Sequence, residues 1–262
     1  MSAFYRVLIA GLVLIPWVLL KNGDSPRFRN EDSPHFLVAV AGGVFFALDL
    51  ALWNTAVMKT QAAVASILGN NTPIVVGILS WIVFRRRPRA SFWIGLGLAL
   101  AGCVLIMSAS LRGAARGSLS GNALALVACV FFAAYLVVTE RVRRSMDTLT
   151  FNALAIAGSI ATLLVICLVM DLPLSGFSTR TWASLAGLGL ISQLMAYYAL
   201  VYALGHLPAT ITSVGLLAQV PCTAALAWLL LGEPLTPTQL TGGAIVLAGI
   251  WVVNRYSGDD DR

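Results

Sequence analysis

The chain has 262 residues, of which 59% are hydrophobic and 11% charged, and its mean hydropathy is +0.87. Such a composition leaves too little polar surface to cover a soluble globule, so it excludes a soluble enzyme or binding domain and predicts an all-α integral membrane protein. The formal net charge of +6 does not indicate a nucleic-acid partner, because the basic residues lie in short segments between apolar runs and form no continuous basic face.

Nine apolar runs are candidates to cross a bilayer, since a helix that spans about 30 Å of hydrocarbon needs about 20 residues. In chain order they are residues 3–20, 35–58, 62–84, 91–109, 119–139, 148–170, 181–204, 209–231 and 239–253. The connections between them are short and rich in Gly, Pro, Asp and Arg, as expected where helices turn at the membrane surface. No soluble domain fits between the runs.

The basic residues are distributed unequally when the connections are assigned alternately to the two sides of the membrane. One side receives twelve Lys and Arg residues, and the other receives five, Arg6, Lys59, Arg112, Arg116 and Arg180. By the positive-inside rule the richer side is cytoplasmic. This predicts a multi-pass protein of the cell membrane, the inner membrane of a bacterium, with a cytoplasmic C-terminus. The segment RRRPR at 85–89 has a second interpretation, a site for anionic lipid or for a substrate phosphate.

The sequence contains an internal repeat. Residues 56–73 align with 204–221, and residues 95–107 align with 242–254. The period covers five helices, an odd number, so the two halves should have opposite orientations across the membrane. Inverted repeats of this kind are typical of secondary transporters, whose substrate site lies near the midplane. We predict a first repeat at 1–110, a second repeat at 118–256 and an acidic cytoplasmic tail at 257–262.

The two helix-break-helix units that contain Pro73 and Pro221, the GEPLT turn at 232–236 and the small-residue stretches GLGLALAG and GGAIVLAG resemble the EamA type of the drug/metabolite transporter superfamily. The resemblance covers nearly the whole chain and implies ten helices, in two sets of five, that export amino acids or other small metabolites. Two departures are visible. The first repeat offers four helices, so the first helix of the family is expected to be missing, and Phe84-Arg85 stands where the second repeat has Gly232-Glu233.

Polar side chains inside the apolar runs are the candidate site, because they are costly to place in hydrocarbon and are usually kept for a pathway or a partner. Asp49 is the only acid well inside a run, and Trp53 follows four residues later on the same helical face. In the repeat alignment Asn71 matches Gln219 and Asp49 matches Tyr197, which suits one cavity lined by both repeats. We therefore predict a substrate site that is lined by Asp49, Trp53, Asn54, Asn71, Tyr135, Gln193, Tyr197 and Gln219.

Each of these residues has a structural alternative. We expect Asp49 to bind a coupling proton or a substrate amine, and the alternative is a structural hydrogen bond. For Asn71 and Gln219 the alternative is a hydrogen bond that holds the helix bundle together. No Lys or Arg is expected to lie buried near Asp49.

The predicted function is secondary transport, the export of small organic metabolites by alternating access. The expected partners are a small-molecule substrate and the lipid bilayer; a homodimer is left open, and no cofactor or metal is expected. An enzyme is disfavoured because His35 and His206 are the only histidines and no HExxH, GxSxG or nucleotide-binding motif occurs. The alternative from another class is a membrane subunit that does not transport, or a transporter that depends on a partner chain.

Overall fold

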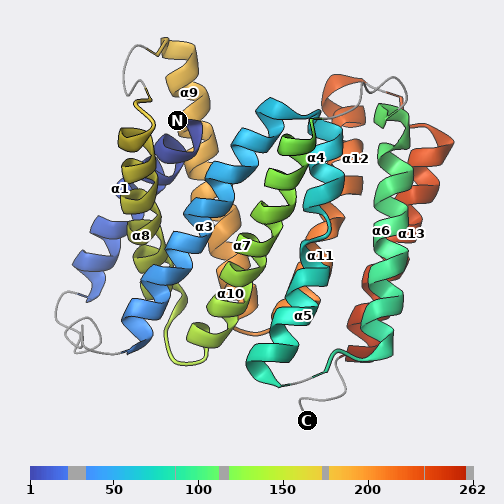
Figure 1. Cartoon of the computed structure of the whole chain (residues 1–262), viewed down its shortest axis with the longest axis horizontal. Coiled ribbons are helices and arrows are strands. Elements are labelled where there is room, and N and C mark those ends of the chain that lie inside the picture. Colours follow the sequence, from blue (N-terminus) through green and yellow to red (C-terminus); the bar gives the residue numbers. More distant parts are fainter. Residues whose placement is uncertain (23–33, 86, 112–117, 173–176, 233, 258–262) are drawn as a thin grey trace. The chain divides into compact units, whose positions relative to one another are not determined.

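The computed structural model describes residues 1–22, 34–85, 87–111, 118–172, 177–232 and 234–257 (Figure 1). Within these ranges the chain forms helices and no strands, which confirms the all-α prediction. The elements are α1 (Ser2–Asn22), α3 (Pro34–Lys59), α4 (Ala62–Gly69), α5 (Thr72–Phe84), α6 (Ala90–Leu111), α7 (Leu119–Arg143), α8 (Thr148–Val169), α9 (Thr179–Gly187), the π-helix η1 (Leu188–Ala196), α10 (Tyr197–Leu204), α11 (Ala209–Gly215), the 3-10 helix η2 (Leu216–Ala218), α12 (Gln219–Leu231) and α13 (Pro237–Ser257).

Eight helical segments in the described part of the chain are long and apolar enough to cross a membrane. Three of them are composite: α4 with α5, α9 with η1 and α10, and α11 with η2 and α12. The ninth predicted run forms α13, which has 21 residues but is less apolar because Thr, Gln and Asn interrupt its hydrophobic stretch. The tail at 258–262 lies outside the described residues, as do Arg112 and Arg116.

The chain divides into two compact units that do not coincide with the predicted repeats. Unit 1 comprises Met1–Asn54 and Ala134–Leu207, and unit 2 comprises Thr55–Ala133 and Pro208–Arg262. Each unit thus combines a part of the first repeat with a part of the second. Because the helices α3 and α7 each run from one unit into the other, both units share continuous backbone. The boundaries of the two repeats stay a prediction.

Unit 1 is held together by small residues at helix crossings. Helices α1 and α8 lie side by side (Figure 1), and a Cβ atom added at Gly11 would come within 2.6 Å of Ile160. Where α3 meets α8, a Cβ atom at Gly43 would overlap the carbonyl oxygen of Ala155. The Ser159 hydroxyl donates a hydrogen bond to the Gly43 carbonyl at this crossing (2.8 Å). Small residues allow such backbone contact in lipid, where dispersion and interhelical hydrogen bonds replace the hydrophobic effect.

Helices α6 and α13 form the centre of unit 2. They lie side by side along their length (Figure 1). Glycines line the contact: a Cβ atom at Gly102 would come within 2.6 Å of the Gly242 carbonyl oxygen, and one at Gly249 within 2.5 Å of the Gly95 carbonyl oxygen. The small-residue stretches GLGLALAG and GGAIVLAG therefore contact each other. Their buried neighbours form the apolar core of the unit, Phe92, Leu96, Ala99, Cys103, Ile106, Ile211, Val214, Leu217, Val246 and Val253.

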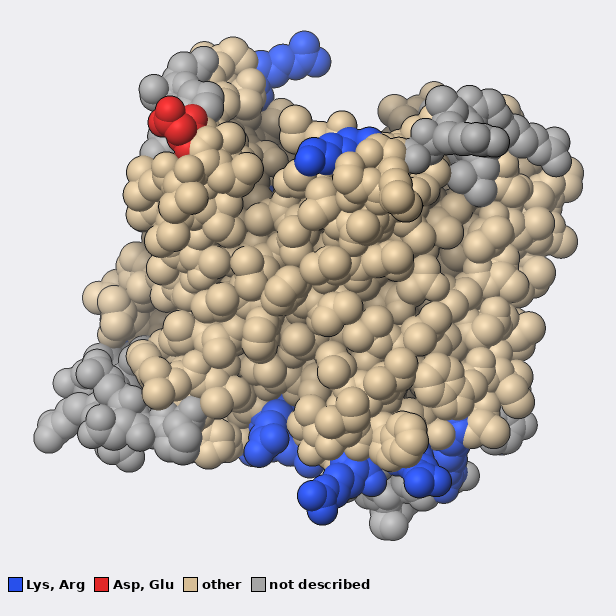
Figure 2. Space-filling view, viewed as in Figure 1, with Lys and Arg blue, Asp and Glu red and all other residues tan. Residues whose placement is uncertain are grey.

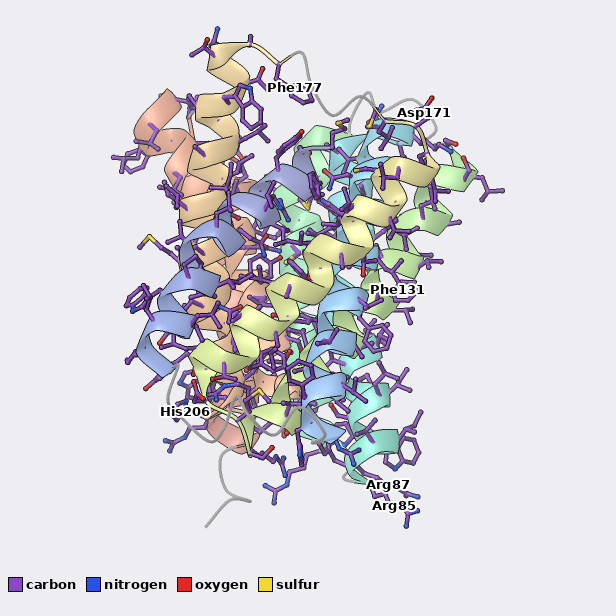
Figure 3. All side chains as sticks on the ribbon, turned by 90° about the vertical axis from the view of Figure 1, so that its left-hand side faces the viewer. Arg85, Arg87, Phe131, Asp171, Phe177 and His206 are labelled. Atoms are coloured by element: carbon purple, nitrogen blue, oxygen red, sulfur yellow. The ribbon has the colours of Figure 1, made fainter. Side chains whose placement is uncertain are left out.

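On one face of the molecule the charged side chains lie at helix ends (Figure 2). The described residues of this face place Lys and Arg at the ends of the helices and leave the flanks between them uncharged. Within unit 1, Asp171 and Phe177 lie at one end and His206 at the opposite end (Figure 3), so the segment from α9 to α10 runs the length of the unit. This distribution is the one expected for helices whose middle parts contact hydrocarbon.

Candidate functional site

Four polar side chains of unit 1 interact electrostatically, and we group them with Gln193 of η1, which packs against α1, under the name unit-1 polar cluster. Its members are Arg6 on α1, Asp49 on α3, Tyr135 on α7, Gln193 on η1 and Tyr197 at the start of α10. All five positions belong to unit 1 and lie within segments long and apolar enough to cross a membrane. Asp49, Tyr135, Gln193 and Tyr197 lie well inside these segments, where polar groups are costly, whereas Arg6 lies about one turn from the start of α1.

Aromatic contacts fix the position of the two tyrosines relative to α3. The ring of Phe46 lies 5.0 Å from that of Tyr135 and 4.6 Å from that of Tyr197, between ring centroids. Phe46 precedes Asp49 by three residues, so the two side chains lie on neighbouring parts of one helical face. Thr139 donates a hydrogen bond to the Tyr135 carbonyl (2.6 Å), one turn earlier on α7. Both tyrosine rings thus pack against Phe46, beside the part of α3 that carries Asp49.

Arg6 supplies a positive charge to the cluster and corrects the sequence prediction. Its guanidinium interacts electrostatically with the carboxylate of Asp49 and with Tyr197. We expected no Lys or Arg near Asp49 and counted Arg6 among the charges at the membrane surface. That expectation was wrong: Arg6 lies within α1, its side chain is half-buried, and its charge acts on Asp49. The signal in the sequence was a single charge inside the apolar run at 3–20.

Two polar atoms of the cluster are buried without a hydrogen-bond partner among the described residues. They are Nε of Arg6 and Oε1 of Gln193, and the Gln193 side chain is only 1% exposed. Polar atoms buried in this way are rare, because each forfeits its hydrogen bonds to water. Both atoms therefore have hydrogen-bonding capacity that the described part of the chain does not use.

Gln193 lies on the π-helix η1, a feature that no sequence pattern predicted. The run at 181–204 was expected to be one continuous α-helix, but Leu188–Ala196 adopts the wider π conformation. The π-helix packs against α1, where a Cβ atom at Gly189 would lie 3.0 Å from the Arg6 carbonyl oxygen. Single π segments inside α-helices occur frequently at functional sites, since they redirect side chains away from the regular helical face.

The remaining predicted site residues are held differently. On α3 Trp53 is half-buried, and Asn54 donates from Nδ2 to the Leu50 carbonyl in its own helix (2.6 Å). Asn71 and Gln219 belong to unit 2, where Gln219 is exposed at the start of α12. The predicted cavity lined by both repeats stays a prediction.

Asn71 belongs to the break between α4 and α5, whose carbonyl groups are bonded by side chains. Its Nδ2 atom donates to the carbonyls of Ile67 (2.9 Å) and Leu68 (3.1 Å). Because Pro73 has no N–H group, Gly69 loses its usual helical partner, and the Thr72 hydroxyl donates to the Gly69 carbonyl instead (2.8 Å). The break predicted from the proline is thus confirmed, and the hydroxyl next to the proline bonds the carbonyl that the proline leaves free.

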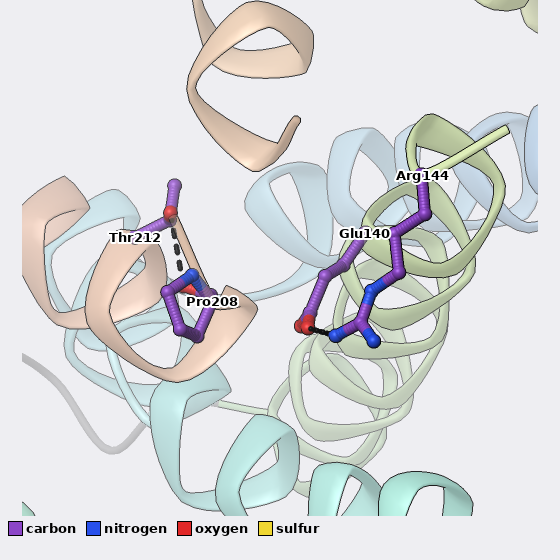
Figure 4. A network of polar contacts seen from close by, with 4 residues as sticks. All are labelled: Glu140, Arg144, Pro208 and Thr212. Carbon is purple, nitrogen blue, oxygen red and sulfur yellow. Dashed lines mark hydrogen bonds and ion pairs between the residues drawn. The ribbon is translucent and has the colours of Figure 1, made fainter. Parts of the chain in front are cut away.

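A second polar network lies where α7 ends and α8 begins. Arg144 forms an ion pair with Glu140 (2.8 Å; Figure 4), and Arg143 donates to the carbonyls of Val201 (3.2 Å) and Met146. Asp147 caps α8 by accepting a hydrogen bond from the Thr150 amide (3.0 Å). Figure 4 also shows the Thr212 hydroxyl donating to the Pro208 carbonyl at the start of α11.

The pKa of Asp147 lies below its ordinary value. Burial would raise the pKa, but the hydrogen bonds from Thr150 and the positive charge of Arg143 together lower it. The charged carboxylate is therefore the form that this helix end stabilises. Among the described residues, no three His, Cys, Asp or Glu side chains lie close enough together to hold a metal ion.

Known proteins resemble the chain over nearly its whole length. Residues 1–108 and 119–255 match the model of the EamA-like transporter family. An uncharacterized transporter of Bacillus subtilis (strain 168), YwfM, is 30% identical over 255 residues, which cover 95% of this chain and 82% of that protein. An uncharacterized transporter of Archaeoglobus fulgidus is 33% identical over 233 residues, which cover 87% of this chain and 80% of that protein.

A protein of known crystal structure has the same fold. It superposes with a TM-score of 0.80 at 18% sequence identity, and the match covers 98% of this chain and 88% of that chain. The names of the relatives indicate membrane transport and not enzymatic activity.

Proposed function

Because the chain belongs to the EamA-like transporter family, we propose that it exports small organic solutes, amino acids or related metabolites, across the cell membrane. It acts as a secondary transporter that works by alternating access. The observation that carries this proposal is the unit-1 polar cluster, which holds a carboxylate, a guanidinium and two buried unpartnered polar atoms within membrane-spanning segments. Ionisable groups at such positions usually belong to substrate or proton pathways.

Each member of the cluster has a role in this proposal. Asp49 binds the coupling proton or the amino group of the solute. The rings of Tyr135, Tyr197 and Trp53 contact the body of the solute through stacking and cation–π attraction, and the Gln193 amide accepts a hydrogen bond from it. The assignment of Asn54, Asn71 and Gln219 to the substrate site stays a prediction.

The proposed orientation places the C-terminus in the cytoplasm of a bacterial cell. Its support is the excess of Lys and Arg in the connections on that side, including Arg143 and Arg144 at the end of α7. A C-terminal fusion to green fluorescent protein, which fluoresces only when it folds in the cytoplasm, tests the orientation. If the fusion to green fluorescent protein does not fluoresce and a C-terminal fusion to alkaline phosphatase is active, the C-terminus lies on the opposite side of the membrane.

Efflux from proteoliposomes tests the function. The purified chain is reconstituted with a mixed panel of amino acids and small metabolites, and flux is measured at two pH gradients. We expect Asp49→Asn to lower gradient-driven flux by about tenfold or more, since it removes the only charge that can bind a proton or an amine in the cluster. Asp171→Asn is the matched control: it removes an exposed acid of the same unit, and asparagine tolerates the positive φ of 48° at that position.

Two results would contradict the proposal. Equal flux in Asp49→Asn and Asp171→Asn would show that Asp49 has no part in transport. If the monodisperse wild-type protein moves none of the solutes at either gradient, the chain is instead a subunit that does not transport alone. Size-exclusion profiles of all variants show whether each remains folded.

A further inference from the structure

The turn between α5 and α6 concentrates positive charge within unit 2. Residues 85–89 have the sequence RRRPR, and residues 50–139 include no Asp or Glu. Arg85 and Arg87 are exposed and lie at the end of α5 (Figure 3). The partner that the charge of this turn fits is therefore an anion.

The backbone of the turn is unusual at Arg85, which ends α5 with a positive φ of 55°. Gly232 ends α12, the helix that matches α5 in the predicted repeat, with a similar φ of 70°. This conformation suits glycine and disfavours a residue that has a Cβ atom. The second repeat thus carries the residue that the backbone prefers, whereas the first carries an arginine. Such outliers are concentrated at positions that bind ligands.

Two tryptophans form the surface beside the turn. The guanidinium carbon of Arg87 lies over the Trp81 ring, 5.0 Å from its centroid. Trp93 of α6 packs across to α5, where its ring would lie 3.3 Å from a Cβ atom added at Gly77, one turn before Trp81. Trp81 is 45% exposed and Trp93 is 41% exposed, so a ligand can reach both rings. Cation–π attraction positions the guanidinium, whose N–H groups are the donors that match a phosphate.

The surroundings of the turn favour a lipid over a dissolved phosphate. Both helices that flank it are long and apolar enough to cross a membrane, and tryptophans at the ends of such helices typically lie at the level of the lipid headgroups. The exposed apolar side chains next to the turn are Ile78, Ile82 and Val83 on α5 and Ile94 and Leu98 on α6. A phospholipid can bond to the arginines and lay its acyl chains along these side chains, whereas a dissolved phosphate gains only the first contact.

We propose that Arg85 and Arg87 bind the phosphate of an anionic phospholipid at the turn between α5 and α6. The rings of Trp81 and Trp93 contact its glycerol backbone and the start of its acyl chains. The positive-inside rule accounts for basic residues at a helix end, but it does not account for an arginine in a glycine conformation or for one that lies over an aromatic ring. This lipid site is independent of the unit-1 polar cluster and of the transport function.

Stabilisation of the purified protein by added lipid tests the proposal. Thermal unfolding in a nonionic detergent is measured with phosphatidylglycerol, with phosphatidylcholine of the same acyl chains, and with glycerol phosphate as a soluble anion. We expect phosphatidylglycerol to raise the melting temperature by about 3 °C or more beyond the effect of phosphatidylcholine. This preference should weaken at high salt, because salt screens contacts between exposed charges. Glycerol phosphate at the same concentration should have no effect.

Substitutions of the arginines separate lipid binding from folding. Arg85→Gly removes a charge and relieves the positive φ, so its melting temperature without lipid should equal or exceed that of the wild type, while most of the preference for phosphatidylglycerol is lost. Arg87→Gln should also lose most of the preference. Arg141→Gln, which removes an exposed arginine in the last turn of α7, is the control and should keep it.

Substitutions of the tryptophans separate a specific site from a general effect of charge. Trp81→Leu removes the ring beneath Arg87 and leaves every charge in place, and we expect it to weaken the preference for phosphatidylglycerol. Trp228→Leu is the matched control, because Trp228 is an exposed tryptophan on α12 of the same unit. It should keep the preference of the wild type.

Three results would overturn the proposal. The first is equal stabilisation of the wild-type protein by the two phospholipids. The second is an unchanged preference in Arg85→Gly and Arg87→Gln, as expected if these arginines pair with the acidic tail at 257–262 or serve topology alone. The third is an equal loss in the control variants Arg141→Gln and Trp228→Leu. Equal stabilisation by glycerol phosphate would assign the turn to a soluble anion in place of a lipid. None of these results bears on the transport function, which the flux measurements test separately.

Discussion

Polar side chains at the break between α4 and α5 differ from those of the unit-1 polar cluster in how they are bonded. At the break between α4 and α5 in unit 2, the side chains of Asn71 and Thr72 donate to the carbonyls that the interrupted helix leaves free. In the unit-1 polar cluster, Nε of Arg6 and Oε1 of Gln193 are buried with no such partner. Both regions place polar groups within membrane-spanning segments, and both keep a buried atom without a partner among the described residues, since Nδ2 of Asn70 at the break has none; the difference is that Asn71 and Thr72 bond neighbouring carbonyls.

This difference separates structural from functional polar groups. A hydrogen bond within the chain stabilises the fold by about 1 kcal/mol, whereas an unsatisfied buried polar atom costs about 1–3 kcal/mol. The cluster therefore lowers the stability of unit 1 in the unliganded protein, and a solute that bonds its free atoms recovers that energy as binding. Substitutions of the bonded side chains at the break should change stability, and substitutions in the cluster should change transport.

The largest effect on stability is expected at the contact between α6 and α13. Gly102→Val would place a Cβ atom 2.6 Å from the Gly242 carbonyl oxygen and 2.7 Å from the Val246 amide nitrogen, and these backbone atoms cannot move without separating the helices. We expect a loss of about 3 kcal/mol or more. Gly97→Val is the matched control on the same helix, because a Cβ atom at Gly97 meets nothing within 4 Å. Size-exclusion chromatography after heating gives the melting midpoint of each variant. Equal midpoints for Gly102→Val and Gly97→Val would show that the α6–α13 contact can adjust to a larger side chain.

The second-largest loss of stability is expected from Asn71→Leu. It removes the donors to the carbonyls of Ile67 and Leu68 at the helix break, and the loss of folding free energy should be about 2 kcal/mol. Asn54→Leu is the comparison: its Nδ2 also donates to a carbonyl one turn earlier, Leu50, but within an uninterrupted helix whose backbone bonds remain. Thermal unfolding of the two variants should differ by several degrees. A transport defect in Asn71→Leu that exceeds its loss of folded protein would instead assign Asn71 to the substrate site.

Gln193→Met should lower transport without lowering stability. Methionine has a similar volume, and replacing the amide removes a buried oxygen without a partner, so the melting temperature should stay unchanged or rise slightly. Gradient-driven flux should fall by about tenfold because the solute loses an acceptor. Ser192→Ala, the neighbouring position on η1, serves as the control. A drop in melting temperature with unchanged flux would mean that Gln193 supports the fold.

Sequence patterns predicted the positions of the helices well because hydrocarbon requires long apolar runs, which are easy to recognise. The break at Pro73 was predictable for the same kind of reason, since proline removes a specific backbone donor. The π-helix η1 could not be predicted, because the composition of Leu188–Ala196 is as apolar as that of an α-helix. We attribute its π conformation to packing against α1. Arg6 was missed because its position inside an apolar run was explained by topology. The division into two units could not be predicted from the sequence, since it depends on contacts between segments that are distant in sequence.

The smallest effect on stability is expected from Asp147→Ala. Asp147 belongs to unit 1 but lies outside the membrane-spanning segments. Asp147 is a satisfied polar group, bonded to the Thr150 amide at the start of α8, so its loss should affect stability by about 1 kcal/mol at neutral pH and leave solute flux unchanged. Because the pKa of Asp147 is lower in the folded than in the unfolded protein, its stabilising effect is complete above the unfolded value, about 3.9, and is lost as the pH falls through the folded value. Melting curves of the wild type and Asp147→Ala should therefore differ at pH 7 and converge as the pH falls below about 4. A difference that persists at low pH would mean that the side chain acts through packing and not through its charge.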